Sequence, residues 1–281
     1  MPIQSAARAG RAVKPARVDG IAENVRSEQA EVSHGVGPGR PRISVCMAVH
    51  NGAKFIVEQV GSILPQLSTG DELVVVDDAS TDSSISAIES FHDERIRILR
   101  QPENRGVVPT FAHAFTAARG EIIFLADQDD VWDSGKVQKV LDVFARNPDV
   151  TLVMTNLVMI DGAGNRISGP KFGQRKFRAG ILRNLVRNQY QGSAMAVRRS
   201  ALEYCLPFPD DVPMHDVWIG LVNQFVGRAA FIEEPLLLYR RHGSNDSPDR
   251  HAPIPRMIRW RWSLVRNLCL LYLRRIAFRR K

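Results

Sequence analysis

From residue 43 to about residue 150, short runs of consecutive apolar residues alternate with segments of helical periodicity. A strand that is apolar at every position must be buried on both faces, which is typical of a parallel sheet covered by helices. The predicted strands are residues 43–49, 73–76, 96–99 and 122–125. The predicted helices are residues 53–67, 80–91, 107–118 and 134–147. We therefore expect an α/β fold of the Rossmann-like kind, with a mostly parallel sheet flanked by helices.

Two of these strands end at clustered carboxylates. Asp77 and Asp78 follow the second strand, and Asp127, Asp129 and Asp130 follow the fourth. Ligands of such sheets bind at the carboxyl ends of the strands, where both clusters are expected to lie. Close carboxylates repel one another unless a cation sits among them, so a divalent metal holding a diphosphate would suit the second cluster. The alternatives are a solvated acidic turn for that cluster and helix capping for the first.

The turn after the first strand, HNGAKF, lacks the GxGxxG pattern of dinucleotide-binding enzymes, and the chain has no P-loop. A dinucleotide-binding enzyme is therefore a poor alternative. Phosphate groups must instead be neutralised by a metal ion or by side chains, because no glycine-rich loop offers them backbone N–H groups.

The formal net charge of +8 belongs to the two ends of the chain. Residues 1–42 contain seven Lys and Arg against four Asp and Glu, and residues 256–281 contain nine against none. Residues 43–255 contain 22 basic and 26 acidic residues, so no nucleic-acid groove is indicated there. The three cysteines are far apart and show no metal or redox spacing, which fits a reducing compartment.

Several segments resemble, in the same order, the motifs of one enzyme family. They are ISVCMAVHNG (43–52), ELVVVDDASTDSS (72–84), ENRG (103–106), GEIIFLADQDDVW (120–132), GSAMAVRR (192–199), MHDVW (214–218) and PLLLYRRHGSN (235–245). The chain resembles the family 2 inverting glycosyltransferases of GT-A fold, and within them a bacterial branch with the acidic motif DQDD that includes rhamnosyltransferases. The resemblance covers about 200 of the 281 residues and leaves out both charged ends.

The resemblance implies a nucleotide-sugar site in the first half of this region. Asp78 corresponds to the carboxylate that contacts the nucleotide base, and Asp77 lies beside it. The strand end from Ala48 to His50 would line the nucleotide pocket, and Arg105 of the ENRG motif would bind the nucleotide-sugar.

The resemblance also implies a metal and a catalytic base. Asp127 and Asp129 correspond to the DxD pair, with Asp129 as the direct ligand of Mg²⁺ or Mn²⁺ and Asp127 closer to the ribose or sugar. His242 would approach the metal or the diphosphate, with a loop histidine as the alternative. Asp216 corresponds to the general base, since an attacking hydroxyl must lose its proton as the new bond forms.

Five other residues carry a functional and a structural interpretation. His215 would orient Asp216 or reach the acceptor, but a structural histidine is favoured. Arg240 and Arg241 would pair with phosphates or lie solvated in a loop. For the tryptophans of DVW and HDVW, at 132 and 218, core packing is favoured over stacking on a sugar.

The expected organisation is one GT-A domain with charged ends. Residues 1–42 are predicted to be a disordered basic extension and linker without a secretory signal. Residues 43–250 form the domain, of which 43–150 bind the nucleotide-sugar and 151–250 handle the acceptor. The second half contains a strand at 151–160, bent at Asn156, and a basic segment at 171–187. This segment would face an anionic acceptor or form a mobile solvated loop, and the loop is favoured.

Residues 251–281 are predicted to form a basic amphipathic helix. Its longest uncharged run, residues 267–273, is far shorter than the ~20 residues that a membrane-spanning helix requires. The predicted apolar face consists of Ile258, Trp262, Val265, Cys269, Tyr272 and Ile276. A helix of this kind lies on an anionic membrane surface, but leucines on the other face make packing against the domain or a second subunit the alternative.

The sequence thus predicts an inverting glycosyltransferase that moves one sugar from a nucleotide-sugar donor to an acceptor hydroxyl. The branch resemblance favours dTDP-rhamnose as donor and a lipid-linked or cell-surface glycan as acceptor. We expect the enzyme in the cytoplasm, peripheral at the cytoplasmic face of the inner membrane. A sugar nucleotidyltransferase and a non-catalytic scaffold docked to membranes are the alternatives.

Overall fold

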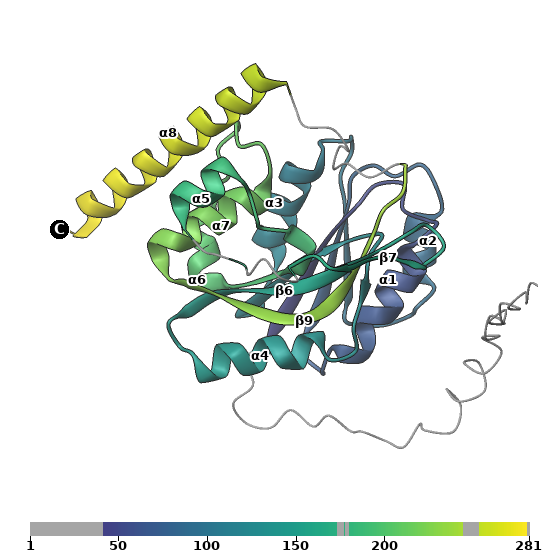
Figure 1. The fold of residues 1–281 in the computed structure, drawn as a ribbon. Helices are drawn as coiled ribbons and strands as arrows, with labels where there is room; N and C mark the ends of the chain where they lie inside the picture. Colours follow the sequence, from purple (N-terminus) through teal and green to yellow (C-terminus); the bar gives the residue numbers. More distant parts are fainter. Residues whose placement is uncertain (1–41, 173–176, 178–179, 244–252, 280–281) are drawn as a thin grey trace, which may run out of the picture. The chain divides into compact units, whose positions relative to one another are not determined.

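The computed structural model describes residues 42–172, 177, 180–243 and 253–279, and only the backbone of 274–279 (Figure 1). The predicted extension and linker at 1–42 therefore lie outside the described residues, apart from Arg42. So do parts of the basic segment at 171–187.

The described chain contains one sheet of nine strands in the order β3-β2-β1-β4-β8-β6-β9-β5, with β7 paired to β6. The strands are β1 (Ile43–Val49), β2 (Glu72–Asp77), β3 (Ile96–Arg100), β4 (Ile122–Asp127), β5 (Val131–Trp132), β6 (Val150–Ile160), β7 (Arg166–Pro170), β8 (Met195–Arg198) and β9 (Arg228–Arg240). Strands β1 to β4 pair in parallel, as do β6 and β9. The predicted mostly parallel α/β sheet is confirmed.

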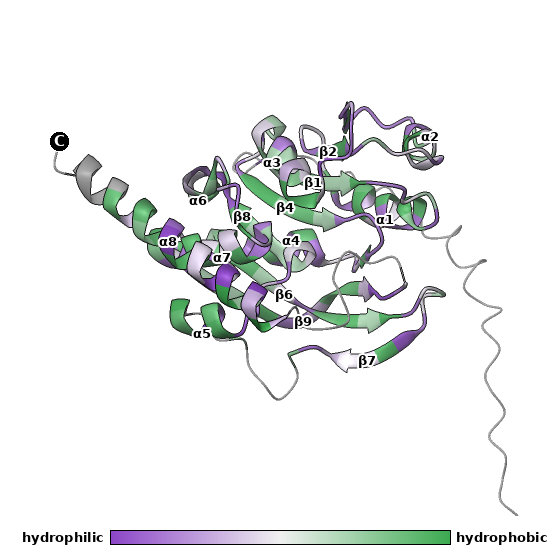
Figure 2. Cartoon of the chain, turned by 90° about the horizontal axis from the view of Figure 1, so that it is seen from above, coloured by the Kyte–Doolittle hydropathy of each residue, from purple (hydrophilic) through white to green (hydrophobic). Residues whose placement is uncertain are grey.

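Helices cover both faces of this sheet. They are α1 (Ile56–Ile63), α2 (Ser84–Glu89), α3 (Val107–Ala117), α4 (Lys136–Arg146), α5 (Ile181–Val186), α6 (Arg199–Leu202), α7 (His215–Val226) and α8 (Ile254–Arg279). Helix α4 lies across one face of β6 and β9, and α7 lies across the other (Figure 1). The strands between these layers are hydrophobic along most of their length (Figure 2), because neither face of the central sheet meets water.

All five strands predicted from apolar runs are present, whereas β5, β7, β8 and β9 were not predicted. Strand β9 contains two glutamates and Pro235, so it lacks the uniform apolar pattern of a buried strand. The predicted bend at Asn156 is confirmed, because the register of β6 against β9 shifts there. Its side chain donates a hydrogen bond to the oxygen of Glu233 (3.0 Å) and accepts one from the N–H of Phe172 (3.1 Å). Asn156 thus supplies the hydrogen bonds that the ladder loses at its irregularity.

Helix α8 packs against α7 through residues that were not on its predicted apolar face. Leu264 and Leu268 are buried, and Ser263 and Asn267 donate hydrogen bonds to Asp211 (2.9 and 2.8 Å). Five residues of the predicted apolar face are exposed, namely Ile258, Trp262, Val265, Cys269 and Tyr272, and the side chain of Ile276 lies outside the described part of the structure. The interpretation that leucines outside that face would pack on the domain is therefore confirmed for Leu264.

Among the described residues, no helix is both long enough and apolar enough to cross a membrane. Although α8 has 26 residues, arginines recur along it and interrupt every apolar run.

Gly120 lies just before β4, against the backbone at the start of β1. A Cβ atom at this position would lie 2.4 Å from backbone atoms of Ile43 and Ser44, which cannot move without breaking the parallel ladder. We expect Gly120→Ala to lower the free energy of unfolding by about 3 kcal/mol. Gly61 is exposed inside α1 with open space around its Cα, so Gly61→Ala should raise it by about 0.5–1 kcal/mol. Urea denaturation of both variants checks this, and equal effects would contradict it.

Candidate active site

The register of three parallel strands brings the predicted nucleotide residues to one edge of the sheet. Ala48 near the end of β1 pairs with Val76 of β2 on one side and with Asp127 of β4 on the other. The next residue of β1, Val49, pairs with Asp77. Two carboxylates thus flank the end of one buried strand, as expected for a ligand site at the carboxyl edge.

Asp78 organises the loop that opens α3. Its two carboxylate oxygens accept hydrogen bonds from the backbone N–H groups of Arg105 (2.8 Å) and Gly106 (2.9 Å). Its backbone oxygen lies 2.8 Å from Nδ1 of His50. Asp77 accepts a hydrogen bond from the N–H of Ser80 (3.0 Å). The predicted nucleotide-site residues His50, Asp77, Asp78 and Arg105 are therefore brought together with Ala48. Asp77 and Asp78 are buried, and Arg105 is exposed.

The acidic turn after β4 is fixed to its neighbours by two glutamines. Gln128 accepts a hydrogen bond from the N–H of His50 (2.9 Å) and donates one to its carbonyl oxygen (3.0 Å). Gln59 of α1 donates to the carbonyl oxygen of Asp127 (2.7 Å). The sequence interpretation missed both residues, although a glutamine between three aspartates is itself a sign that this position is not a charged ligand.

Asp129 and His242, two of the predicted metal residues, are in direct contact. Nε2 of His242 lies 2.8 Å from Oδ2 of Asp129, and both side chains are partly exposed. The ring of Phe55 packs on His242 with the centroids 4.8 Å apart. Within the described part of the chain, no three His, Cys, Asp or Glu side chains converge on a common point. The protein therefore offers a metal a carboxylate and an imidazole, and the remaining ligands would come from phosphate and water.

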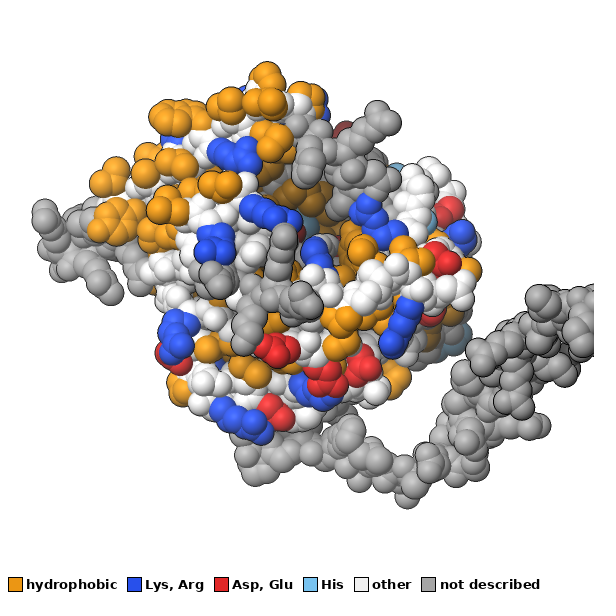
Figure 3. All heavy atoms as spheres, in the orientation of Figure 1, with side chains coloured by type: hydrophobic (Ala, Val, Ile, Leu, Met, Phe, Trp, Pro, Cys, Tyr) orange, Lys and Arg blue, Asp and Glu red, His pale blue; other side chains and the backbone are white. Residues whose placement is uncertain are grey.

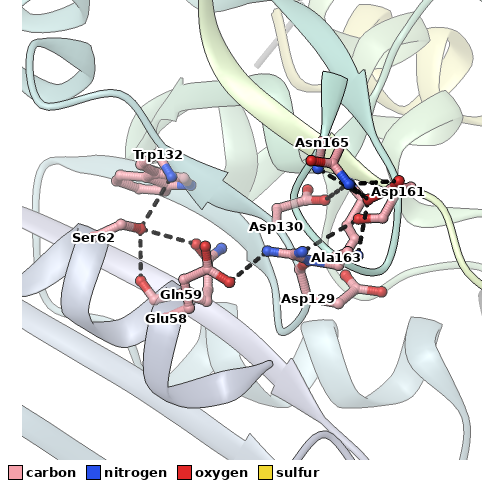
Figure 4. A network of polar contacts seen from close by, with 10 residues as sticks. Glu58, Gln59, Ser62, Asp129, Asp130, Trp132, Asp161, Ala163 and Asn165 are labelled. Carbon is pink, nitrogen blue, oxygen red and sulfur yellow. Dashed lines mark hydrogen bonds and ion pairs between the residues drawn. The ribbon is translucent and has the colours of Figure 1, made fainter. Parts of the chain in front are cut away.

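Arg240 holds the acidic turn in place, and the interpretations as a phosphate ligand or a solvated loop residue are wrong. It lies in β9 and is 2% exposed. Its guanidinium donates to the backbone oxygens of Asp129 (2.8 Å) and Asp161 (3.3 Å) and to Oε2 of Glu58 (2.6 Å). Its own N–H donates to Oδ1 of Asp130 (2.9 Å). Figure 4 shows Glu58, Asp129, Asp130 and Asp161 lying around this network of polar contacts.

Asp130 is fully buried behind this turn. Burial raises the pKa of its carboxyl group well above the ordinary value, and the charges of Asp127 and Asp129 raise it further. Burial also lowers the pKa of Lys136 to about 7, and its ammonium group lies over the ring of Trp132 at 4.1 Å. Nζ of Lys136 also donates a hydrogen bond to the backbone oxygen of Ser193 (2.7 Å). Lys136 therefore links the region behind the acidic turn to the 192–194 segment.

Asp216 lies in the first turn of α7 and contacts the 192–194 segment. Its Oδ2 accepts a hydrogen bond from the N–H of Gly192 (3.3 Å), and its Oδ1 accepts one from the N–H of Val217 (2.6 Å). Burial raises its pKa to about 6, while these N–H groups and the charge of Lys171 act in the opposite direction. The carboxyl group is therefore poised to take up a proton near neutral pH.

Residues 44–206 match the sequence model of the family described as Glycosyl transferase family 2. The match covers more than half of the chain. This protein belongs to glycosyl transferase family 2.

Relatives and solved structures agree with this assignment. An uncharacterized glycosyltransferase of Nostoc sp. is 32% identical over 217 residues, which cover 73% of this chain and 66% of that protein. The crystal structure of S. aureus TarS 1-349 in complex with UDP-GlcNAc matches with a TM-score of 0.62 at 17% identity, over 75% of this chain and 62% of the other. The mannosyltransferase PcManGT from Pyrobaculum calidifontis, in complex with GDP-Man and Mn²⁺, matches with a TM-score of 0.52 at 26% identity, over 70% and 55%. The predicted GT-A fold is confirmed, and the chain spans less than two thirds of the length of each of these proteins.

Three residues of the family 2 domain have the structural role that the sequence favoured. His215 is buried and stacks on Phe111 at 4.1 Å, and burial lowers its pKa to about 3, so it is neutral. Neither ring nitrogen has a hydrogen-bond partner, so it does not orient Asp216. Trp132 and Trp218 are both 3% exposed and pack in the core.

The role of Arg240 in holding the family 2 acidic turn can be measured. Arg240→Met removes the guanidinium donor of the Asp129 carbonyl oxygen and one of two donors of the Asp161 carbonyl oxygen, which keeps the N–H of Gly164 (3.0 Å), so the free energy of unfolding should fall by about 2 kcal/mol. Glu58→Gln keeps an acceptor on a side chain that is 56% exposed, and should cost less than about 1 kcal/mol. Urea denaturation compares the two. Equal losses would mean that the ion pair, and not the carbonyl contacts, holds the turn.

Proposed function

We propose that this chain is an inverting glycosyltransferase in which Asp216 removes the proton of the acceptor hydroxyl. The observation that carries the proposal is the buried carboxyl group of Asp216, whose pKa burial raises to about 6. It contacts the 192–194 segment, which Lys136 connects to the region behind the acidic turn. One direct displacement at the anomeric carbon requires such a base on the side of the acceptor. The N–H of Gly192 and the first turn of α7 hold the carboxylate in place for this step.

The proposed donor site lies along the carboxyl edge of β1, β2 and β4. Asp78 would contact the nucleotide base, since each of its oxygens keeps a lone pair beyond its backbone hydrogen bond. Ala48 and His50 would line the pocket beside Asp77. The exposed side chain of Arg105 would reach the phosphates. TarS and PcManGT hold UDP-GlcNAc and GDP-Man respectively, which supports a nucleotide-sugar as the donor class.

We propose Mg²⁺ or Mn²⁺ as cofactor, held by Asp129 and His242 with Asp127 beside them. The contact between Asp129 and His242 supports this, and hard divalent cations commonly take one or two carboxylates together with phosphate oxygens. Bound there, the ion would stabilise the charge of the departing nucleoside diphosphate. The structure of PcManGT with Mn²⁺ supports a metal-dependent reaction.

For the donor sugar and the acceptor, the proposal depends on the DQDD motif. Its resemblance to rhamnosyltransferases favours dTDP-rhamnose as donor and a lipid-linked or cell-surface glycan as acceptor. The acceptor would be met at the cytoplasmic face of the inner membrane. Since GT-A folds serve many donors, a panel of nucleotide-sugars is the first test of this choice.

Asp216→Asn should lower transfer at least 1,000-fold while the affinity for the nucleoside diphosphate stays within about twofold, because the amide cannot accept the proton. In the unaltered enzyme the base must be ionised, so kcat/KM should rise about tenfold per pH unit below pH 6 and level off above it. Because burial makes the ionised carboxylate unfavourable, the variant should be no less stable at pH 8. Rates against pH, calorimetric titration and urea denaturation check these three outcomes.

Asp210 is an exposed carboxylate in the loop that precedes α7, so Asp210→Asn is the matched control and should keep full activity. Loss of nucleotide affinity in Asp216→Asn would remove Asp216 from the base role and place it in the donor site.

Asp129→Ala should abolish the dependence of nucleoside diphosphate binding on Mn²⁺, because it removes the carboxylate that contacts His242. Calorimetric titrations with and without Mn²⁺ measure the effect. Glu121→Ala, an exposed acid next to the opposite end of β4, is the control and should leave the Mn²⁺ dependence intact. An unchanged Mn²⁺ dependence in Asp129→Ala would contradict the assignment of this ligand.

A further inference from the structure

Two helices of the second half present an unusually apolar surface to solvent. On α5, Leu182 is 81% exposed and Val186 is 71% exposed. On α8, Trp262 is 69% exposed and Ile258 is 61% exposed. We call these residues, together with Val265 and Tyr272 of α8, the α5–α8 surface. Exposed apolar groups of this size gathered in one place mark an interaction site rather than ordinary surface.

Helix α8 has two apolar sectors, and only one of them is buried. The buried sector contains Leu264 and Leu268. With about 100° between successive residues, Tyr272, Val265, Ile258 and Trp262 lie about 60°, 80°, 100° and 140° around the helix from the midpoint of those two leucines, so the second sector borders the first and turns progressively away from the domain. A helix that needed only to pack on the domain would carry polar residues in this second sector.

Contacts between α5 and α8 join their exposed residues into one surface. The guanidinium of Arg261 donates hydrogen bonds to the backbone oxygens of Leu185 (2.9 Å) and Val186 (2.8 Å), at the end of α5. These bonds satisfy carbonyl groups that the helix end leaves free and fix α5 beside α8. Figure 3 shows hydrophobic side chains gathered over both helices, and α5 is mostly hydrophobic in Figure 2, apart from Arg183 and Asn184.

The charged side chains of the two helices have one sign. Neither α5 nor α8 contains an acidic residue, and the acid that contacts α8, Asp211, is paired with Arg266. Arg183 and Arg187 at α5, and Arg256 and Arg259 on α8, are exposed. Apolar side chains that include a tryptophan, bordered by arginines, complement a bilayer with anionic head groups, and each cation near such a membrane adds to the attraction.

We infer that the α5–α8 surface docks on the surface of an anionic lipid bilayer, with Trp262 and its apolar neighbours inserted at the level of the head groups. The inference rests on the proposed function in one respect, because docking would serve to bring the active site to a lipid-linked acceptor. Helix α8 packs on α7, whose first turn holds Asp216, and it begins twelve residues after His242. Docking would therefore place the acceptor side of the site close to the lipid.

Flotation of the full chain with vesicles tests the inference without any sugar transfer. Binding should be at least tenfold stronger to vesicles of phosphatidylglycerol and phosphatidylethanolamine than to phosphatidylcholine, and should weaken as salt is raised. Brominated lipids should quench the tryptophan fluorescence, and Trp262→Phe should lose most of that quenching while it still binds. Trp132 and Trp218 are buried and contribute little to this readout, and Trp260, which is partly exposed on α8, is replaced by phenylalanine in both proteins of the comparison so that the quenching reports Trp262.

Ile258→Asp combined with Trp262→Asp should weaken vesicle binding at least tenfold. Both side chains are exposed, so the fold should persist, as nucleoside diphosphate binding would verify. A matched pair separates this effect from a general change of surface charge. Val186→Asp should weaken binding, whereas Val57→Asp, on a valine that is 52% exposed on α1, should not.

Three results would overturn the inference. They are absence of flotation with anionic vesicles, equal flotation of the double variant, and a dimer in analytical ultracentrifugation that Ile258→Asp with Trp262→Asp converts to a monomer. The last result would assign the surface to a second copy of the chain. Since transfer to a soluble acceptor needs no vesicle, a failure of docking is distinguishable from a failure of the proposed reaction.

Discussion

Negative charge gathered at one edge of a buried sheet is the constraint on which the rest of this structure depends. The parallel register that brings Asp127 and Asp77 to either side of β1 is imposed by hydrophobic burial, whatever the charges at its end. Repulsion between such carboxylates must then be compensated locally. The chain does so with backbone N–H donors at Asp78, with the guanidinium of Arg240 and with a raised pKa at Asp130. The carboxylate of Asp129 stays at the surface, beside His242.

The same compensation joins the two halves of the domain. Arg240 belongs to β9, Asp161 follows β6, and Glu58 comes from α1, so one guanidinium connects three parts of the chain that are far apart in sequence. The buried Lys136 and the N–H of Gly192 continue this connection toward Asp216. A buried ionisable group with a shifted pKa lowers stability, and such groups are therefore concentrated where a ligand or a reaction makes use of them.

Helix α8 has two apolar sectors, one packed on the domain and one exposed to solvent. Its narrow buried sector, around Leu264 and Leu268, stabilises the helix on α7, while the wider apolar sector beside Trp262 remains in water. Leaving that much apolar surface exposed has a free-energy cost of roughly 25 cal/mol per Å², so it is unfavourable unless something covers it. The arginines that border it exclude the interior of a bilayer and favour its surface.

The strands β1 to β4 and β6, the α/β class and the two acidic clusters could all be predicted from the sequence alone. Continuous apolar runs and the residues that follow them are local features. The bend at Asn156 and the packing of Trp132 and Trp218 were equally predictable. Only the tertiary structure decided that Arg240 supports the acidic turn, because its partner Asp129 lies 111 positions away. The same holds for the sector of α8 that packs on the domain. A helix with two apolar sectors can bury either one, and which one is buried depends on the shape and polarity of the surface it packs against.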